Sequence, residues 1–117
     1  MSDASEGAAV QVPDLDESGR DFLKALASET RQQVMALFAG GVQLSVGEVA
    51  ERAGLGPSTA SEHLSLLKRG GLLVSVREGK TVRYRADATM IAARLDGLKA
   101  YLTLCCPPSD CSNSGCS

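Results

Sequence analysis

The residues best suited to chemistry are four cysteines within the last thirteen residues of the chain: Cys105, Cys106, Cys111 and Cys116. Cysteine thiolates select soft, thiophilic ions, and trivalent arsenic and antimony prefer three sulfur ligands in a pyramid. The spacing C-C-x4-C-x4-C differs from the C-x2-C pairs that are typical of structural zinc sites. We therefore predict a site for As(III) or Sb(III) made by Cys105, Cys106 and Cys111, with Cys116 as a further candidate ligand.

This cysteine-rich end follows directly on a predicted helix over about 88–104, and two prolines after the paired cysteines end that helix. Cys105 and Cys106 leave the helix in different directions, and Cys111 can fold back toward them at a modest cost in chain entropy. A fourth thiolate would instead suit a tetrahedral ion such as zinc, cadmium or mercury. A redox switch and an incidentally cysteine-rich end remain as alternatives.

Length and composition predict one globular domain that positions these thiols. The chain has 117 residues, of which 44% are apolar and only 3% aromatic, so the core is expected to be aliphatic. Three parts are predicted: an acidic disordered arm over 1–13, a folded domain over 14–104 and a cysteine-rich metalloid-binding tail over 105–117. No apolar run is long enough to cross a membrane, and the N-terminus lacks a signal pattern, which predicts a cytoplasmic protein.

Two helices are predicted in the first part of the domain. Pro13 and Asp14 are expected to start the first, and Ser28 is expected to cap the second, which the glycine pair Gly40–Gly41 ends. Arg31 lies near the start of the second helix, where its charge opposes the helix dipole. We expect an acid or a phosphate as its partner.

The middle of the chain carries a helix-turn-helix pattern followed by a hairpin. Ser45 is expected to cap a short helix, Gly54-Leu55-Gly56 forms a turn, and a second helix runs from about Pro57 to Arg69. Two β-prone runs over 72–76 and 81–85 then flank a basic turn over 77–80. The predicted fold class is mainly α with a β-hairpin, in the order of a winged helix-turn-helix.

Polar and basic side chains concentrate on the second helix and the hairpin. Residues 68–85 hold six basic residues against one acidic residue, a surplus that suits a polyanion. Small donors and acceptors on the helix can reach base edges and phosphates, and a basic wing can contact the DNA backbone. Taken one at a time, Ser58 could simply cap the helix and His63 could simply be a hydrogen-bonded spacer, with no contact to DNA. Together, the predicted DNA-binding residues are Ser58, Thr59, Ser61, Glu62, His63, Lys68, Arg77, Lys80 and Arg83.

Three motifs resemble the ArsR/SmtB family of metal-sensing repressors: Ser28-Glu29-Thr30-Arg31, the run STASEHL over 58–64, and REGK over 77–80 with Tyr84. The resemblance spans about Asp21 to Tyr101. It implies a homodimer formed through the first and last helices, binding to palindromic operator DNA, and repression that a metal or metalloid relieves.

Departures from the family pattern narrow the choice of sensing site. The helix before the turn holds no cysteine pair, and the last helix holds no histidine, so two of the family's common metal sites are absent from the sequence. The variant that remains in the family uses adjacent cysteines and one downstream. By this resemblance the ligands are Cys105, Cys106 and Cys111.

The sequence thus predicts a non-enzymatic, metalloid-responsive repressor that releases operator DNA on binding As(III) or Sb(III). No phosphate-binding loop, C-x2-C thiol pair or Cys–His arrangement supports an enzyme. Two alternatives stay open. The same fold could sense Cd(II), Pb(II), Hg(II), a methylated arsenical or an oxidant, or the protein could buffer metal without binding specific DNA.

Overall fold

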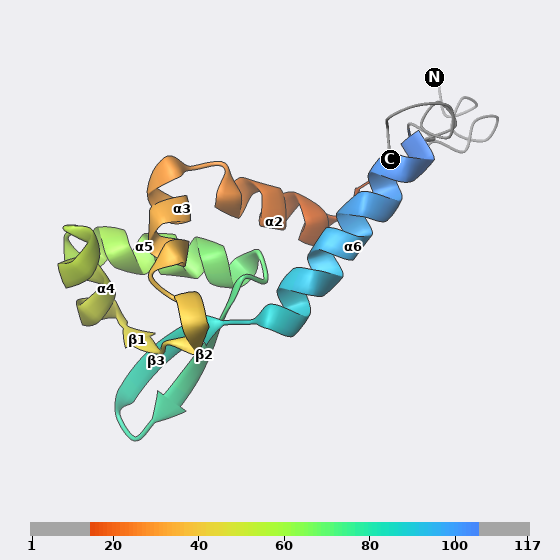
Figure 1. Ribbon diagram of the computed structural model, residues 1–117. Coiled ribbons are helices and arrows are strands. Elements are labelled where there is room, and N and C mark those ends of the chain that lie inside the picture. Colours follow the sequence, from red (N-terminus) through yellow and green to blue (C-terminus); the bar gives the residue numbers. More distant parts are fainter. Residues whose placement is uncertain (1–14, 106–117) are drawn as a thin grey trace.

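The computed structural model describes residues 15–105, and Figure 1 shows a helical body, a protruding hairpin and one long helix that extends to one side. The predicted fold class, mainly α with a β-hairpin, is confirmed. In chain order the described elements are α2 (Glu17–Leu26), α3 (Glu29–Ala36), the 3-10 turn η1 (Ala39–Gly41), β1 (Leu44–Ser45), α4 (Val46–Ala53), α5 (Pro57–Arg69), β2 (Leu73–Glu78), β3 (Thr81–Ala86) and α6 (Ala88–Cys105).

Helix α5 lies at the centre of the body and packs against α2, α3, α4 and β2. Its residues Ala60, Leu64 and Leu67 are fully buried, as their helical spacing predicts. Leucine, valine and alanine make up most of the core, with Phe22 and Phe38 as its aromatic members. The apolar stripe of α5 thus fixes which side of this helix faces outward.

Side-chain caps set the helix starts. The Ser28 hydroxyl accepts a hydrogen bond from the Arg31 backbone N–H, and the Ser45 hydroxyl accepts one from Glu48, as predicted. The predicted start of the first helix at Pro13 and Asp14 needs correction. Helix α2 begins at Glu17, because Asp16 has extended backbone angles and its carboxylate accepts a hydrogen bond from the Gly19 N–H. Pro13 and Asp14 lie outside the described residues.

The sheet contains one strand more than the predicted hairpin. Strands β2 and β3 pair in antiparallel register from Leu73 opposite Ala86 to Glu78 opposite Thr81, so the turn is shorter than predicted. Strand β1 pairs with the other edge of β3, which gives the order β1-β3-β2. This short strand ties the start of α4 to the wing.

Helix α6 leaves the body after β3, and α2 is the helix that lies beside it (Figure 1). Its first turn is capped by Asp87, whose carboxylate accepts a hydrogen bond from the Met90 N–H at 3.1 Å. This cap is not among the predicted ones. Three leucines on α6 are exposed, Leu95, Leu102 and Leu104, the last by 69%. Within residues 15–105, none of the helices combines the length and the hydropathy needed to span a bilayer.

Candidate nucleic-acid interface

The outward face of α5 carries polar side chains. Gly56 is the N-cap and makes no side-chain cap, so the alternative role of Ser58 as a cap is wrong. Because an α-helix has about 3.6 residues per turn, Ser58, Glu62, Ser65 and Arg69 share the face opposite the buried stripe. All four are exposed, and the predicted residues Thr59 and Ser61 are exposed as well.

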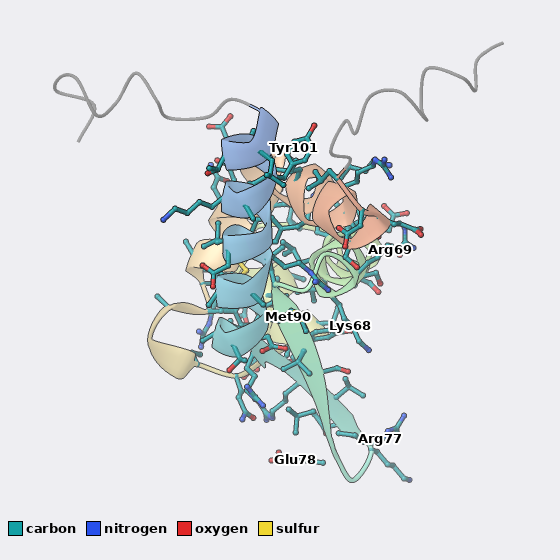
Figure 2. The ribbon with its side chains drawn as sticks, turned by 90° about the vertical axis from the view of Figure 1, so that its right-hand side faces the viewer. Lys68, Arg69, Arg77, Glu78, Met90 and Tyr101 are labelled. Atoms are coloured by element: carbon teal, nitrogen blue, oxygen red, sulfur yellow. The ribbon has the colours of Figure 1, made fainter. Side chains whose placement is uncertain are left out.

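Two further residues of this face, Ser65 and Arg69, are not among the predicted DNA-binding residues, although the helical period identifies them. Together with Ser61, Glu62 and Leu66 they line a shallow depression on the surface of α5. Figure 2 shows Arg69 and Lys68 at the same end of this helix. The described outer face of α5 is therefore longer than predicted and ends in basic residues.

His63 lies on the flank of α5 and is half-buried. Its Nδ1 is 3.5 Å from a terminal guanidinium nitrogen of Arg31. The expectation that Arg31 pairs with an acid is wrong, because its guanidinium donates to the backbone carbonyl oxygens of Ala25 and Lys24 at 2.8 and 2.9 Å. These carbonyls lie at the C-terminal end of α2, where the helix dipole favours a cation. The alternative expectation of a phosphate partner stays a prediction.

The wing presents exposed basic side chains. Arg77 and Lys80 lie near its tip, and Arg85 lies nearer its base, opposite Val74. Figure 2 shows Arg77 and Glu78 near the end of the hairpin. Lys68 of α5 donates to the Ser75 hydroxyl of β2 at 2.9 Å, which brings the basic end of α5 against the wing. The polar helix and the basic hairpin thus form adjoining parts of the molecule.

Arg83 lies between the wing and the helix-turn-helix. Its guanidinium is 3.1 Å from a Glu48 carboxylate oxygen and 3.7 Å from one of Glu78. The same Glu48 oxygen accepts the Ser45 backbone N–H at 2.8 Å. This backbone hydrogen bond is the largest cause that lowers the pKa of Glu48, and the positive charge of Arg83 lowers it further. Arg83 therefore connects β3 to the first turn of α4.

Helix α6 contacts the end of α5 at Gly71. This glycine has a φ of +86°, and a Cβ there would lie 2.8 Å from Cγ of Met90 and 3.2 Å from Nε of Arg94. That Nε is buried and has no hydrogen-bond partner among the described residues. Only a glycine both adopts this backbone conformation readily and allows α6 to approach so closely.

Of the predicted metalloid ligands, Cys105 is the last residue of α6. The other three cysteines, Cys106, Cys111 and Cys116, lie outside the described residues. Within residues 15–105, no group of three His, Cys, Asp or Glu side chains is arranged to hold a metal ion.

A central helix with a polar outer face, next to a basic wing, defines the class of DNA-binding winged helix-turn-helix proteins. The model of a helix-turn-helix domain family matches residues 26–76. The transcriptional activator HlyU of Vibrio cholerae is 37% identical over 75 residues, which cover 64% of this chain and 68% of HlyU. The probable mercury resistance operon repressor of Streptomyces lividans is 34% identical, over 73% of this chain and 72% of that protein.

Among solved structures, a homodimeric winged helix-turn-helix DNA-binding domain from Mycobacterium bovis, a possible ArsR-family regulator, is similar in fold. Its TM-score is 0.59 at 27% identity, and the match covers 88% of this chain and 89% of that domain. The chain belongs to the ArsR/SmtB family of transcriptional regulators.

Proposed function

We propose that this protein is a metalloid-responsive repressor. In this account a homodimer binds operator DNA through α5 and the wing, and As(III) or Sb(III) bound by Cys105, Cys106 and Cys111 releases it. Two findings support the proposal. Four cysteines stand at or after the last residue of α6 in the sequence, and a similar protein is named a probable mercury resistance operon repressor, mercury being a thiophilic ion. Cys116 is a candidate fourth ligand.

The DNA-facing surface is proposed to consist of the outer face of α5 and the wing tip. Ser58, Thr59, Ser61 and Glu62 lie where base edges would approach, with the omitted residues Ser65 and Arg69 extending this face. Lys68, Arg77 and Lys80 supply positive charge for phosphates. Arg83 is proposed to orient the wing through Glu48, and His63 is considered further below.

The dimer is proposed to form through α2 and α6, as the family resemblance implies. Leu95 and Leu102 on α6 are about half exposed, and Leu23 on α2 is 43% exposed. An apolar surface of this kind is stabilised when a partner covers it. The similar domain from Mycobacterium bovis is homodimeric, which supports the same assembly here.

The observation that carries the regulatory proposal is that α6 connects the end of α5 to Cys105. Near its start, Met90 and Arg94 lie against Gly71, which follows the C-cap residue Gly70 of α5, and its last residue is Cys105. A ligand that fixes the cysteine end would restrict α6 and change the placement of α5. A coupling free energy of about 1–3 kcal/mol would weaken DNA binding by roughly 5–150-fold.

The test is fluorescence anisotropy of the gene's own promoter DNA with reduced protein, followed by titration with As(III), Sb(III), Cd(II), Hg(II) and Zn(II). We expect specific binding that low As(III) or Sb(III) reverses while Zn(II) does not. Cys105→Ser, Cys106→Ser and Cys111→Ser should each abolish the release while preserving DNA affinity. Cys116→Ser shows whether the candidate fourth thiol is a ligand: release is lost if Cys116 binds the ion and is kept if three thiols are sufficient.

Two alternatives have distinct outcomes. If only Cd(II) or Hg(II) releases the DNA, the protein is still a DNA-binding regulator but its ligand is that metal ion and not As(III) or Sb(III). A protein without specific DNA binding would fit metal buffering, but membership in a family of transcriptional regulators favours the DNA-binding class.

A further inference from the structure

Arg31 connects three helices. From the first turn of α3 its Nε and Nη2 donate hydrogen bonds to the carbonyl oxygens of Ala25 and Lys24 at the end of α2. Its remaining terminal nitrogen, Nη1, lies 3.5 Å from Nδ1 of His63 on α5. One half-buried side chain therefore links the first described helix to the helix with the polar outer face.

The chemistry of this contact determines the state of the imidazole. A guanidinium group has five N–H donors and no acceptor, so Nδ1 of His63 must be the acceptor. A neutral imidazole carries a hydrogen on only one of its two nitrogens, which places the hydrogen of His63 on Nε2. With the opposite tautomer, two N–H groups would face each other across 3.5 Å.

We propose that Arg31 is a positioning residue for DNA recognition, because it holds His63 in the Nε2–H tautomer. The flank of α5 then offers DNA a hydrogen-bond donor at this position. The matching acceptors in DNA are phosphate oxygens and, in the major groove, N7 of guanine and adenine, O6 of guanine and O4 of thymine. The inference rests on the proposed DNA binding by α5 and extends it to the tautomer of one side chain and to the residue that sets it.

The tautomer can be measured directly, because His63 is the only histidine in the chain. A long-range ¹H–¹⁵N correlation spectrum of the uniformly ¹⁵N-labelled protein, recorded where the imidazole is neutral, shows one set of ring signals. We expect the wild-type ring to carry its hydrogen on Nε2 and the Arg31→Met protein to show a mixture of tautomers. A wild-type ring with its hydrogen on Nδ1, or an identical distribution in both proteins, overturns the proposal.

Gln32 supplies the matched control. Its side-chain amide donates to the Leu26 carbonyl oxygen at 2.7 Å, so it also ties α3 to the end of α2, yet its side chain is exposed and has no described contact with His63. Arg31→Met should weaken specific DNA binding on the order of tenfold relative to non-specific DNA. Gln32→Met should leave this ratio within about twofold of wild type. Equal losses in the two variants would show that only the α2–α3 connection matters.

Salt dependence separates positioning from direct contact. If Arg31 itself contacted a phosphate, its removal would reduce the steepness of log affinity against log salt by about one per protomer. We expect an unchanged slope for Arg31→Met, and a slope reduced by about one per protomer overturns the positioning role.

Replacement of His63 tests the donor itself. His63→Gln keeps an N–H donor on a side chain of similar reach, whereas His63→Leu removes it. We expect His63→Gln to retain most of the specific affinity that His63→Leu loses, and equal affinities for both variants would contradict the inference. If the wild-type protein binds no specific DNA, the proposed function fails, whereas the spectrum still shows whether Arg31 sets the tautomer.

Discussion

The contact between α6 and the end of α5 can be tested at Gly71. Replacing this glycine with alanine forces a side chain into the left-handed region at φ +86°, which costs roughly 1–2 kcal/mol. The new methyl group would also lie 2.8 Å from Cγ of Met90, and such overpacking adds about 1 kcal/mol or more. Gly71→Ala is therefore expected to lower the free energy of unfolding by roughly 2–3 kcal/mol.

Gly54→Ala is the matched control for this prediction. Gly54 has a φ of +69°, but a Cβ there has no neighbour within 4 Å, so only the backbone cost applies. Urea unfolding of both variants at one protein concentration measures the difference, because the stability of a dimer depends on concentration. Equal losses in the two variants would refute the claim that α6 presses on Gly71.

A second variant locates the clash. Met90→Ala removes the Cγ atom that the new methyl group would meet, so Met90→Ala combined with Gly71→Ala should lose less than the sum of the two single changes. If the losses in the free energy of unfolding of the two single variants simply add in the double variant, the strain at Gly71 does not come from contact with Met90. Because the proposed signal passes through this junction, Gly71→Ala should also reduce the extent of DNA release by As(III).

Three further perturbations test other parts of the molecule. Glu48→Ala should destabilise the protein at neutral pH. Because the folded-state pKa of Glu48 lies below its ordinary value of 4.5, the difference from wild type should disappear as the pH falls below 4.5 through that lowered pKa. Urea unfolding at several pH values checks this, and a constant difference contradicts it. Lys80→Gln should weaken binding to all DNA sequences alike and reduce the slope of log affinity against log salt by about one per wing. Anisotropy at several salt concentrations measures this slope, and an unchanged slope would show that Lys80 contacts no phosphate. Leu102→Asp should shift the protein toward monomers in sedimentation measurements, because it places a charge on the exposed apolar side of α6. A dimer that tolerates Leu102→Asp would place the interface elsewhere.

Local signals in the sequence were sufficient for much of the fold. Ser28 and Ser45 cap their helices as predicted, because a serine before an apolar helical stripe satisfies backbone N–H groups that have no other partner. The period of Ala60, Leu64 and Leu67 gave the buried face of α5 correctly. These features depend on residues close together in the chain.

Features that depend on distant contacts were not predictable. Strand β1 has two residues, too few for any alternation, and exists because Leu44 and Ser45 pair with Tyr84 and Arg83. The true partners of Arg31 are backbone carbonyls, which carry no mark in the sequence. By contrast, Asp87 could have been identified as the cap of α6 from its type and position.

The candidate site divides in the same way. The exposed face of α5 follows from helical periodicity, which also identifies the omitted Ser65 and Arg69. The ion pair between Arg83 and Glu48 could not be predicted from the sequence, because 35 residues separate the two partners along the chain. The cysteine site stays a prediction from residue type and spacing, since Cys106, Cys111 and Cys116 lie outside the described residues.

The most direct test of the central claim measures As(III) affinity twice, for the free protein and for the protein saturated with operator DNA. Absorption from thiolate–arsenic bonds follows the binding. Because coupling between two sites is reciprocal, DNA should weaken As(III) binding by the same factor, roughly 5–150-fold, by which As(III) weakens DNA binding. Equal As(III) affinities in the two states would contradict the account, because a ligand that binds both states equally cannot release the DNA.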